Sequence, residues 1–372
     1  MRFRNVLCFS MAAVLACSSL PANVAQAESL QTREGTEKIV QAQADWEPAT
    51  ETMIQEEVKG ADNDSEYETK SGWKYKMLKN GTLEITGYSG KKTSLTIPSK
   101  IAEKKVSSIG DYAFSFNDSN CPVFDKLKSV KIPGTVKKIG EGAFSYCSSL
   151  KSIKIPKGVT SIGDKTFYFC EKLKSVEFSN TVKSIGEMAF WCTSLKSLTI
   201  PKSLTKISDK AFAYIWGLKA IKVQSGNPAY CAKEGILFTK DKKTLVCCPM
   251  DKKGSYTVPK GVKTIGNGAF AYTNLKNIKF QKGLITIEKD AFFSSGLKNV
   301  VFPEGLKTIG ESALNMCYQL ENVTIPKSVK KIGENAIRSG ISTNPKLKLK
   351  VVRGSYAQKW AKRNNIPYSY IK

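Results

Sequence analysis

One pattern of apolar residues recurs along most of this chain, and it limits the folds that the chain can adopt. From residue 127 the pattern reads Leu-x-x-Val-x-Ile-Pro-x-x-Val-x-x-Ile-Gly-x-x-Ala-Phe-x-x-Cys, and the next copy starts at Leu150. Most copies are 22 or 23 residues long. The second isoleucine marks the phase of the copies at Ile109, Ile139, Ile162, Ile185, Ile207, Ile265, Ile287, Ile309 and Ile332. The aromatic position keeps the same phase at Phe114, Phe144, Phe167, Phe190, Phe212, Phe270 and Phe292, and it becomes Leu314 and Ile337 in the last copies.

A single copy is too short to enclose its own apolar side chains, so each copy must be buried by its neighbours. Alternating apolar residues after the leucine predict a strand that pairs in parallel with the same strand of the next copy, and the proline ends that pairing. The Val-x-x-Ile segment predicts a second short strand, and the Ala-Phe segment predicts one helical turn. The pattern therefore predicts an α/β, mainly β, right-handed solenoid of about ten turns.

The consensus resembles the BspA-like leucine-rich repeats of bacterial surface proteins, over about residues 72–372. The resemblance implies an opening hairpin and cap, an inserted β-hairpin at 224–257, and a closing helix for which Ser355 is a suitable N-cap. It also implies adhesion, with host extracellular-matrix or plasma glycoproteins or partner microbes as ligands.

The first residues predict export from the cell. Arg2 and Arg4 precede an apolar stretch that ends in small residues, which is typical of a signal peptide over residues 1–27. Residues 14–17, Val-Leu-Ala-Cys, also resemble a lipobox, so an alternative is a structural, envelope-facing lipoprotein anchored through Cys17. No later stretch reaches the roughly 20 apolar residues that a membrane span needs.

The rest of the chain divides by composition and by repeat phase. Residues 28–70 hold twelve acidic and four basic residues and predict a disordered acidic linker. We expect a cap hairpin and first repeat at 71–126, leucine-rich repeats at 127–346, and a C-terminal cap at 347–372.

Charge is distributed unevenly between the linker and the repeats. The whole chain carries 58 basic and 32 acidic residues, and 52 of the basic residues against 20 of the acidic ones follow the linker. An excess of this size predicts an anionic extracellular protein or glycan as partner. Nucleic acid is not expected, because the part of the chain after the linker holds only three arginines, the residue that binds phosphates and bases best.

The composition disfavours catalysis. The chain has no histidine, which excludes Ser-His-Asp and Cys-His sites, and we expect no enzyme activity, cofactor or metal. Four cysteines share one repeat position and are expected to pack as small apolar residues: Cys147, Cys170, Cys192 and Cys317. A disulfide between Cys231 and either Cys247 or Cys248 remains an option in an exported hairpin.

Strand alternation also predicts a binding face on a chain that we expect to be monomeric. If the apolar residues of each leucine-containing strand point inward, the residues between them point outward and form columns along the array. The expected face comprises Ser129, Lys131, Ser152, Lys154, Ser175, Glu177, Ser197, Thr199, Lys222, Asn277, Lys279, Asn299, Asn322 and Thr324.

Overall fold

The computed structural model describes residues 65–115, 124–338 and 346–371, which belong to one structural unit, Val58–Lys372. The predicted signal peptide, Cys17 and nearly all of the acidic linker lie outside the described residues. The described residues form a mostly-β parallel solenoid of about twelve turns with one helix near its C-terminal end. The sequence predicted about ten turns. The observed number is larger because hairpin strands outside the repeat pattern also take part in the coil.

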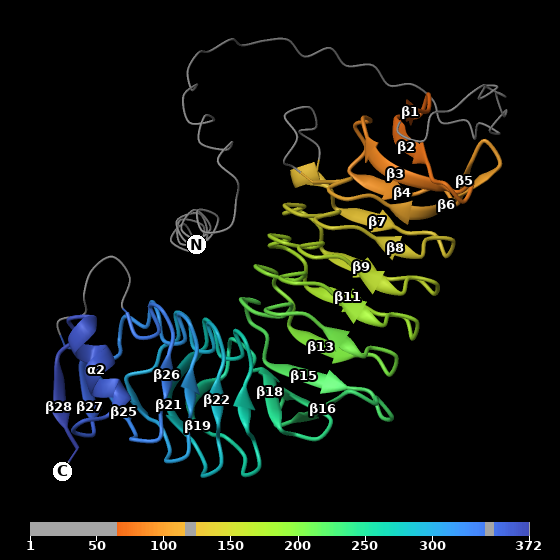
Figure 1. Cartoon of the computed structure of the whole chain (residues 1–372). Helices are drawn as coiled ribbons and strands as arrows, with labels where there is room; N and C mark the ends of the chain where they lie inside the picture. The colour runs from red at the N-terminus through yellow and green to blue at the C-terminus, as the bar shows by residue number, and fades with distance from the viewer. Residues whose placement is uncertain (1–64, 116–123, 339–345, 372) are drawn as a thin grey trace, which may run out of the picture. The chain divides into compact units, whose positions relative to one another are not determined.

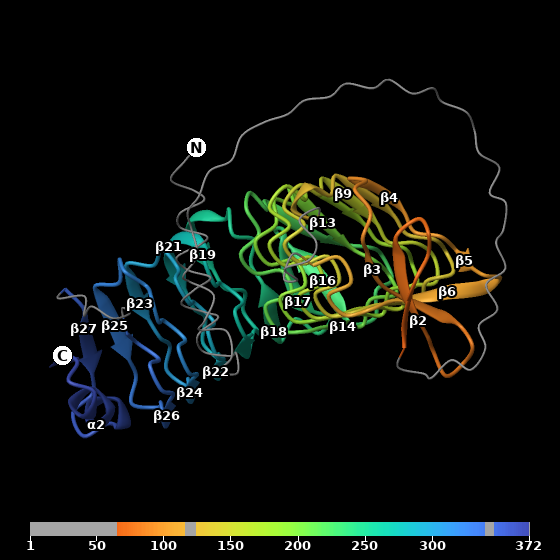
Figure 2. The same cartoon turned by 90° about the horizontal axis from the view of Figure 1, so that it is seen from above.

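Each regular turn contributes two short strands to two sides of the coil, as the predicted pattern requires (Figures 1 and 2). One side carries the strands that follow the leucine, here called the leucine side: β4 (Ser94–Thr96), β7 (Ser129–Lys131), β9 (Ser152–Lys154), β11 (Ser175–Glu177), β13 (Ser197–Ile200), β15 (Ala220–Val223), β19 (Lys253–Thr257), β21 (Asn274–Lys279), β23 (Asn299–Val301), β25 (Asn322–Ile325), β27 (Lys348–Val351) and β28 (Tyr368–Tyr370). The other, isoleucine side carries β3 (Leu83–Tyr88), β6 (Lys104–Ile109), β8 (Lys138–Ile139), β10 (Ser161–Ile162), β12 (Ser184–Ile185), β14 (Lys206–Ile207), β18 (Thr244–Cys247), β20 (Thr264–Ile265), β22 (Thr286–Ile287), β24 (Thr308–Ile309) and β26 (Lys331–Ile332).

The strands pair in parallel with the repeat in register. Ile139 pairs with Ile162, and Ile162 pairs with Ile185, so one apolar column crosses the turns without a slip. A slip of one residue would expose this column, because side chains alternate between the two faces of a strand. The register therefore follows from the apolar pattern itself.

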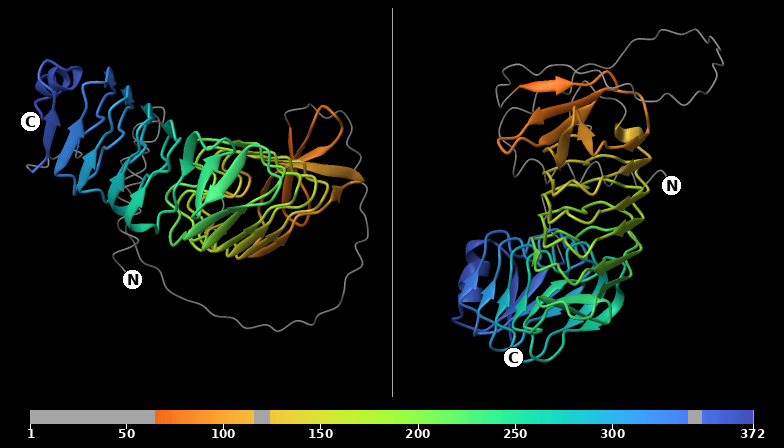
Figure 3. Two further views of the ribbon diagram at one scale, coloured as in Figure 1. Left: turned by 90° about the horizontal axis from the view of Figure 1, so that it is seen from below. Right: turned by 90° about the vertical axis from the view of Figure 1, so that its right-hand side faces the viewer.

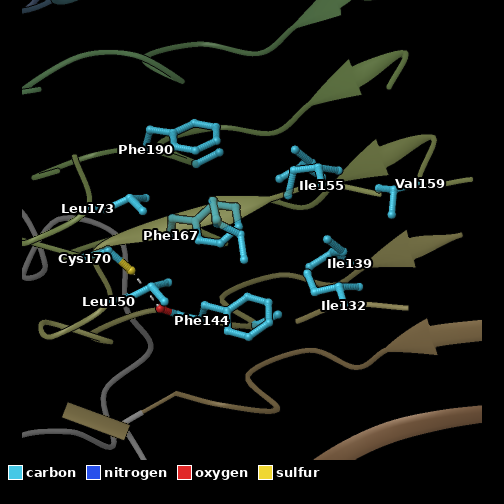
Figure 4. Close-up of a cluster of buried hydrophobic side chains, with 14 of the residues drawn as sticks. Ile132, Ile139, Phe144, Leu150, Ile155, Val159, Phe167, Cys170, Leu173 and Phe190 are labelled. Atoms are coloured by element: carbon cyan, nitrogen blue, oxygen red, sulfur yellow. Dashed lines mark hydrogen bonds between the residues drawn. The ribbon is translucent and has the colours of Figure 1, made fainter. Parts of the chain in front are cut away.

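Phenylalanine rings stack along the interior from turn to turn (Figure 4). The ring centroids of Phe114 and Phe144 are 5.1 Å apart, those of Phe144 and Phe167 5.6 Å, and those of Phe167 and Phe190 5.2 Å. All four side chains are fully buried. Each such burial stabilises the fold by about 1.5–3 kcal/mol before the loss of chain entropy is counted, and no ring could be buried without the turns on both sides.

The Ala-Phe segments form hydrogen-bonded turns, and in these turns the backbone does not continue as helix. Two residues four positions apart take a left-handed φ, for example Lys165 at 51° and Phe169 at 58°. Some N–H groups of the corner donate within their own turn, as from Ser145 to the Gly142 carbonyl at 2.8 Å. The N–H groups that alternate with them donate to the next turn, as from Phe144 to the Thr166 carbonyl at 2.9 Å. Because these donors point along the coil, they cannot close the bonds of an α-helix.

An inserted three-stranded segment interrupts the stack. Strands β16 (Tyr230–Lys233) and β17 (Ile236–Thr239) pair antiparallel, and β17 pairs antiparallel with β18, which rejoins the coil beside β20. The Tyr230 hydroxyl accepts a hydrogen bond from the N–H of Ile207 in β14 at 2.9 Å. It takes the place of the backbone carbonyl that the next regular strand would supply. The buried apolar residues accordingly divide into two clusters that meet at this insertion.

Both ends of the described coil carry additional elements (Figure 3). At the start, β1 (Glu66–Glu68) and β2 (Trp73–Met77) join β3 by antiparallel pairing, β5 (Lys100–Ile101) pairs with β6, and the 3-10 helix η1 (Phe124–Lys126) precedes β7. At the end, the helix α2 (Tyr356–Arg363) begins after Ser355, whose hydroxyl accepts the Gln358 N–H at 3.2 Å. The predicted closing helix and its N-cap are confirmed, and its buried Ala357 and Ala361 cover the last turns.

A charge placed in the isoleucine column should unfold the array. Ile185 is completely buried, and Ile185→Asp would bury an unpaired carboxyl group, so we expect a loss of more than about 4 kcal/mol in the free energy of unfolding. Lys183→Asp, two residues away at an exposed position, should change the urea midpoint little. Equal urea midpoints for the two variants would contradict the inward direction of Ile185.

The glycine after the isoleucine is required by the close approach of the neighbouring turn. A Cβ on Gly163 would lie 2.6 Å from the Glu141 nitrogen, whereas a Cβ on Gly134 would find its nearest neighbour at 3.8 Å. Gly163→Ala should therefore lower the free energy of unfolding by about 1–3 kcal/mol, since backbone must move. Gly134→Ala is the matched control, and thermal melts that shift equally for both would refute this explanation.

Candidate binding face

The residues of the predicted binding face lie on the leucine side of the coil, and all are exposed except the half-buried Asn322 and Thr324. The buried residues between them, such as Val130 and Ile153, point to the interior. The structure brings the face residues together in two stretches, one over β7–β15 and one over β21–β25.

The first stretch presents a row of small hydroxyl groups beside a row of longer side chains. Ser152 pairs with Ser175, and Lys154 pairs with Glu177 in the same register. The Lys154 ammonium lies 2.9 Å from the Glu177 carboxylate, and both side chains are largely exposed. An exposed ion pair of this kind contributes little to stability, so both groups can be recruited by a partner.

In the second stretch asparagine replaces serine. Asn277, Asn299 and Asn322 occupy paired positions on β21, β23 and β25. The Asn322 amide donates to the Asn299 carbonyl oxygen at 2.8 Å, so these two side chains orient each other. Val301, beside them, is 62% exposed and adds an apolar contact surface to an otherwise polar row.

Sequence reasoning missed the part of the face that lies in the hairpin regions. Ser94 and Thr96 on β4 pair with Ser129 and Lys131, and they continue both rows by one turn. On β19, Ser255 pairs with Asn277, and Thr257 pairs with Lys279. A signal was present, because both strands read Ser-x-Thr immediately before an apolar residue and proline.

A further row was missed altogether. The residue after the leucine is an exposed lysine in most turns, and it lies beside the serine row. This lysine row comprises Lys128, Lys151, Lys174, Lys196, Lys219, Lys276 and Lys298. The recurring Leu-Lys pair was the signal for this row. Strand alternation does not reveal it, because in most turns the strand begins one residue after the lysine.

Most of the described cysteines lie in buried positions that suppress thiol chemistry. Cys147, Cys170, Cys192 and Cys317 are all buried, as expected of small apolar packing residues. The Cys170 thiol contacts the Phe144 carbonyl oxygen at 3.1 Å (Figure 4). Burial raises the pKa of Cys317 to about 11 and that of Cys247 to about 12, so few thiolates form at neutral pH.

Strand order separates Cys231 from Cys247, one of the two partners considered for a disulfide in the inserted segment. Cys231, Cys247 and Cys248 are free thiols. Cys231 lies on β16 and Cys247 on β18, and β17 separates the two strands. Two strand spacings amount to about 9.6 Å, which exceeds the Cα separation that a disulfide tolerates.

A cavity of about 200 Å³ lies where β14, β18 and β20 meet. Asp209, Asn267 and Glu288 are among its lining residues, and desolvation, together with the charge of Asp209, raises the pKa of Glu288. Beside it, the Lys210 ammonium and the Asp290 carboxylate form a mostly buried ion pair at 2.6 Å. No group of three or more Cys, Asp or Glu residues with metal-binding geometry occurs within the described ranges.

The repeat matches a known family over more than half of the chain. Residues 118–230 and 249–349 match the BspA type leucine rich repeat region, with six copies. The chain belongs to this family. Its repeats are typical of non-enzymatic scaffolds for protein interaction. The search of curated proteins found no match.

Solved structures of bacterial leucine-rich repeat proteins share the fold. A leucine rich cell surface protein from Faecalibacterium prausnitzii is 25% identical, with 81% of this chain and 98% of that chain covered and a TM-score of 0.57. A leucine-rich repeat protein from Eubacterium ventriosum is 25% identical, with 77% and 78% covered and a TM-score of 0.56. The pneumococcal vaccine antigen PcpA is 22% identical, with 84% and 100% covered and a TM-score of 0.62, which shows the fold alone. In the part of this chain that the structure describes, no helix has the length and apolar character to cross a bilayer.

Alkylation should separate the packed cysteines from the accessible one. Cys231 is only half buried, whereas Cys147, Cys170 and Cys317 are enclosed and the pKa of each is raised by burial. At pH 8 we expect iodoacetamide to label Cys231 first and the other three only after unfolding. Mass spectrometry of the labelled peptides checks this order, and rapid labelling of Cys170 in the folded protein would contradict it.

Proposed function

We propose that this chain is an exported recognition protein that acts in secreted form or at the bacterial surface. In this proposal the predicted face on the leucine side binds an anionic extracellular protein or a glycan. The repeat family and the resemblance to a bacterial cell-surface protein support the location. We propose that the chain acts as a monomer without catalysis, because the feature that recurs from turn to turn is an exposed surface.

The observation that carries the proposal is the alignment of exposed polar side chains across many turns. Ser152, Ser175 and most of their counterparts offer a hydroxyl or amide group at one position per turn, and basic side chains lie beside them. A surface of this kind gives many weak contacts at fixed spacing, which add up only for an extended or repetitive partner. The excess of lysine favours partners with negative charge.

Immobilised glycoproteins and glycans test the proposal. We expect the protein to bind sialylated or sulfated glycoproteins at low salt and to lose binding as salt screens the charges. Ser175→Trp places a bulky group at an exposed position of the face and should weaken binding by about tenfold, since a misfit near the centre of an interface costs most.

The matched control is Thr160→Trp, an equally bulky change at an exposed residue next to β10 on the isoleucine side. It should leave binding unchanged if the leucine side is the face in contact. Absence of binding to every anionic glycoprotein and glycan at low salt, or equal weakening by both variants, would refute the proposed face.

A further inference from the structure

The lysine row is the most regular charged feature of the described residues. Each member directly follows a leucine that is buried to 1% exposure or less: Leu127, Leu150, Leu173, Leu195, Leu218, Leu275 and Leu297. The leucine fixes the backbone of its turn in the interior, so the following lysine emerges at the same place on every turn. The seven lysine side chains themselves are exposed.

Backbone hydrogen bonds tie neighbouring members of the row together. The Lys174 N–H donates to the Lys151 carbonyl at 2.9 Å, and the Lys151 N–H donates to the Lys128 carbonyl at 3.4 Å. Lys219 donates in the same way to Lys196 at 3.4 Å. Strands joined by backbone hydrogen bonds are about 4.8 Å apart, and such bonds also join turns whose leucine-side strands are not paired, as from Ser194 to the Leu173 carbonyl at 3.0 Å. The five lysines from Lys128 to Lys219, on consecutive turns, therefore span about 19 Å.

Such a row is unfavourable for the protein alone. Like charges at directly neighbouring positions of a sheet repel, and solubility would be served equally well by alternating signs. Among the described residues, the ion pairs include one member of the row, Lys298, whose ammonium lies 3.2 Å from the Glu321 carboxylate. The five lysines from Lys128 to Lys219 take part in none of the described ion pairs.

A second set of lysines lies across the serine row on the same turns. Lys131, Lys154 and Lys222 occupy the outward position of β7, β9 and β15, and Glu177 is the acidic residue among these positions. The five turns therefore present the lysine row on one side, a row of four serines and Ala220 in the middle, and a mixed row on the other side that holds three lysines, Glu177 and Thr199. Hydroxyl groups at this position suit the hydroxyl groups of a sugar chain, which both donate and accept hydrogen bonds.

We infer that the leucine side from β7 to β15 binds a linear anionic polysaccharide that lies along the solenoid axis and meets one lysine of the lysine row on each turn. The inference rests on the proposed function and names its partner class. A single-stranded nucleic acid fits less well, because these rows contain neither arginine nor an aromatic side chain on which bases could stack.

The length of the ligand is the first test. Size-defined oligosaccharides, one series sulfated and derived from heparin, the other carrying only uronate carboxylates, are titrated against the full chain. We expect affinity in one or both series to rise at least about tenfold between a fragment that spans one lysine interval and one that spans about 19 Å. The preferred series identifies whether sulfate or carboxylate is recognised. Affinity that does not grow with length, or single-stranded DNA of equal charge that binds more tightly, would overturn the inference.

A charge-matched pair of variants is the second test. The row variant Lys151→Gln/Lys174→Gln/Lys196→Gln removes three charges from the centre of the lysine row. The control Lys138→Gln/Lys183→Gln/Lys206→Gln removes three charges from exposed positions on the isoleucine side. We expect the row variant to weaken polysaccharide binding by at least about tenfold and to flatten its salt dependence, because fewer counterions are displaced. The control should change affinity by no more than about threefold, through the field of the whole protein.

Equal losses for the two variants would show that net charge alone attracts the ligand and would overturn the assignment to the row. Melting temperatures matched to the unmodified protein exclude unfolding as the cause of any loss. If the chain binds glycoproteins through its face but binds no free polysaccharide, the inference fails while the proposed function stands. If it binds neither, both fail.

Discussion

Contact between neighbouring turns is the interaction on which the whole structure depends. A typical turn supplies one ring to the phenylalanine stack, one isoleucine to a paired column and one leucine that anchors the next strand. None of these side chains is enclosed by its own turn. The fold is therefore stable only as an array, and the chain has to repeat the same few apolar residues at nearly constant spacing.

The sequence allowed the solenoid, its register and its closing helix to be predicted, because buried positions require apolar residues and these residues recur at regular spacing. The left-handed corners have no such pattern in the sequence. They are formed by residues such as Lys165 and Phe169, which have no preference for positive φ, and the hydrogen bonds to the next turn hold them there. Ser255 and Thr257 escaped prediction for another reason, since the insertion broke the phase by which outward residues were counted.

The same burial that stabilises the coil determines where chemistry is available. Cys170 and Cys317 are enclosed, and the raised pKa of each keeps the thiol protonated. Polar groups, in contrast, are carried outward at fixed intervals by the strands of the leucine side. Apolar spacing inside thus determines polar spacing outside, and the surface acquires the regularity of the core.

The division of the interior at β16–β18 has a mechanical consequence. Because the two apolar clusters are separate, the turns on either side of the insertion keep their own enclosed side chains when the other set opens. Under a pulling force we expect the array to lengthen in two stages instead of failing at once. In the first stage one set of turns would unfold, which lengthens the chain and absorbs mechanical work while the remaining turns stay folded.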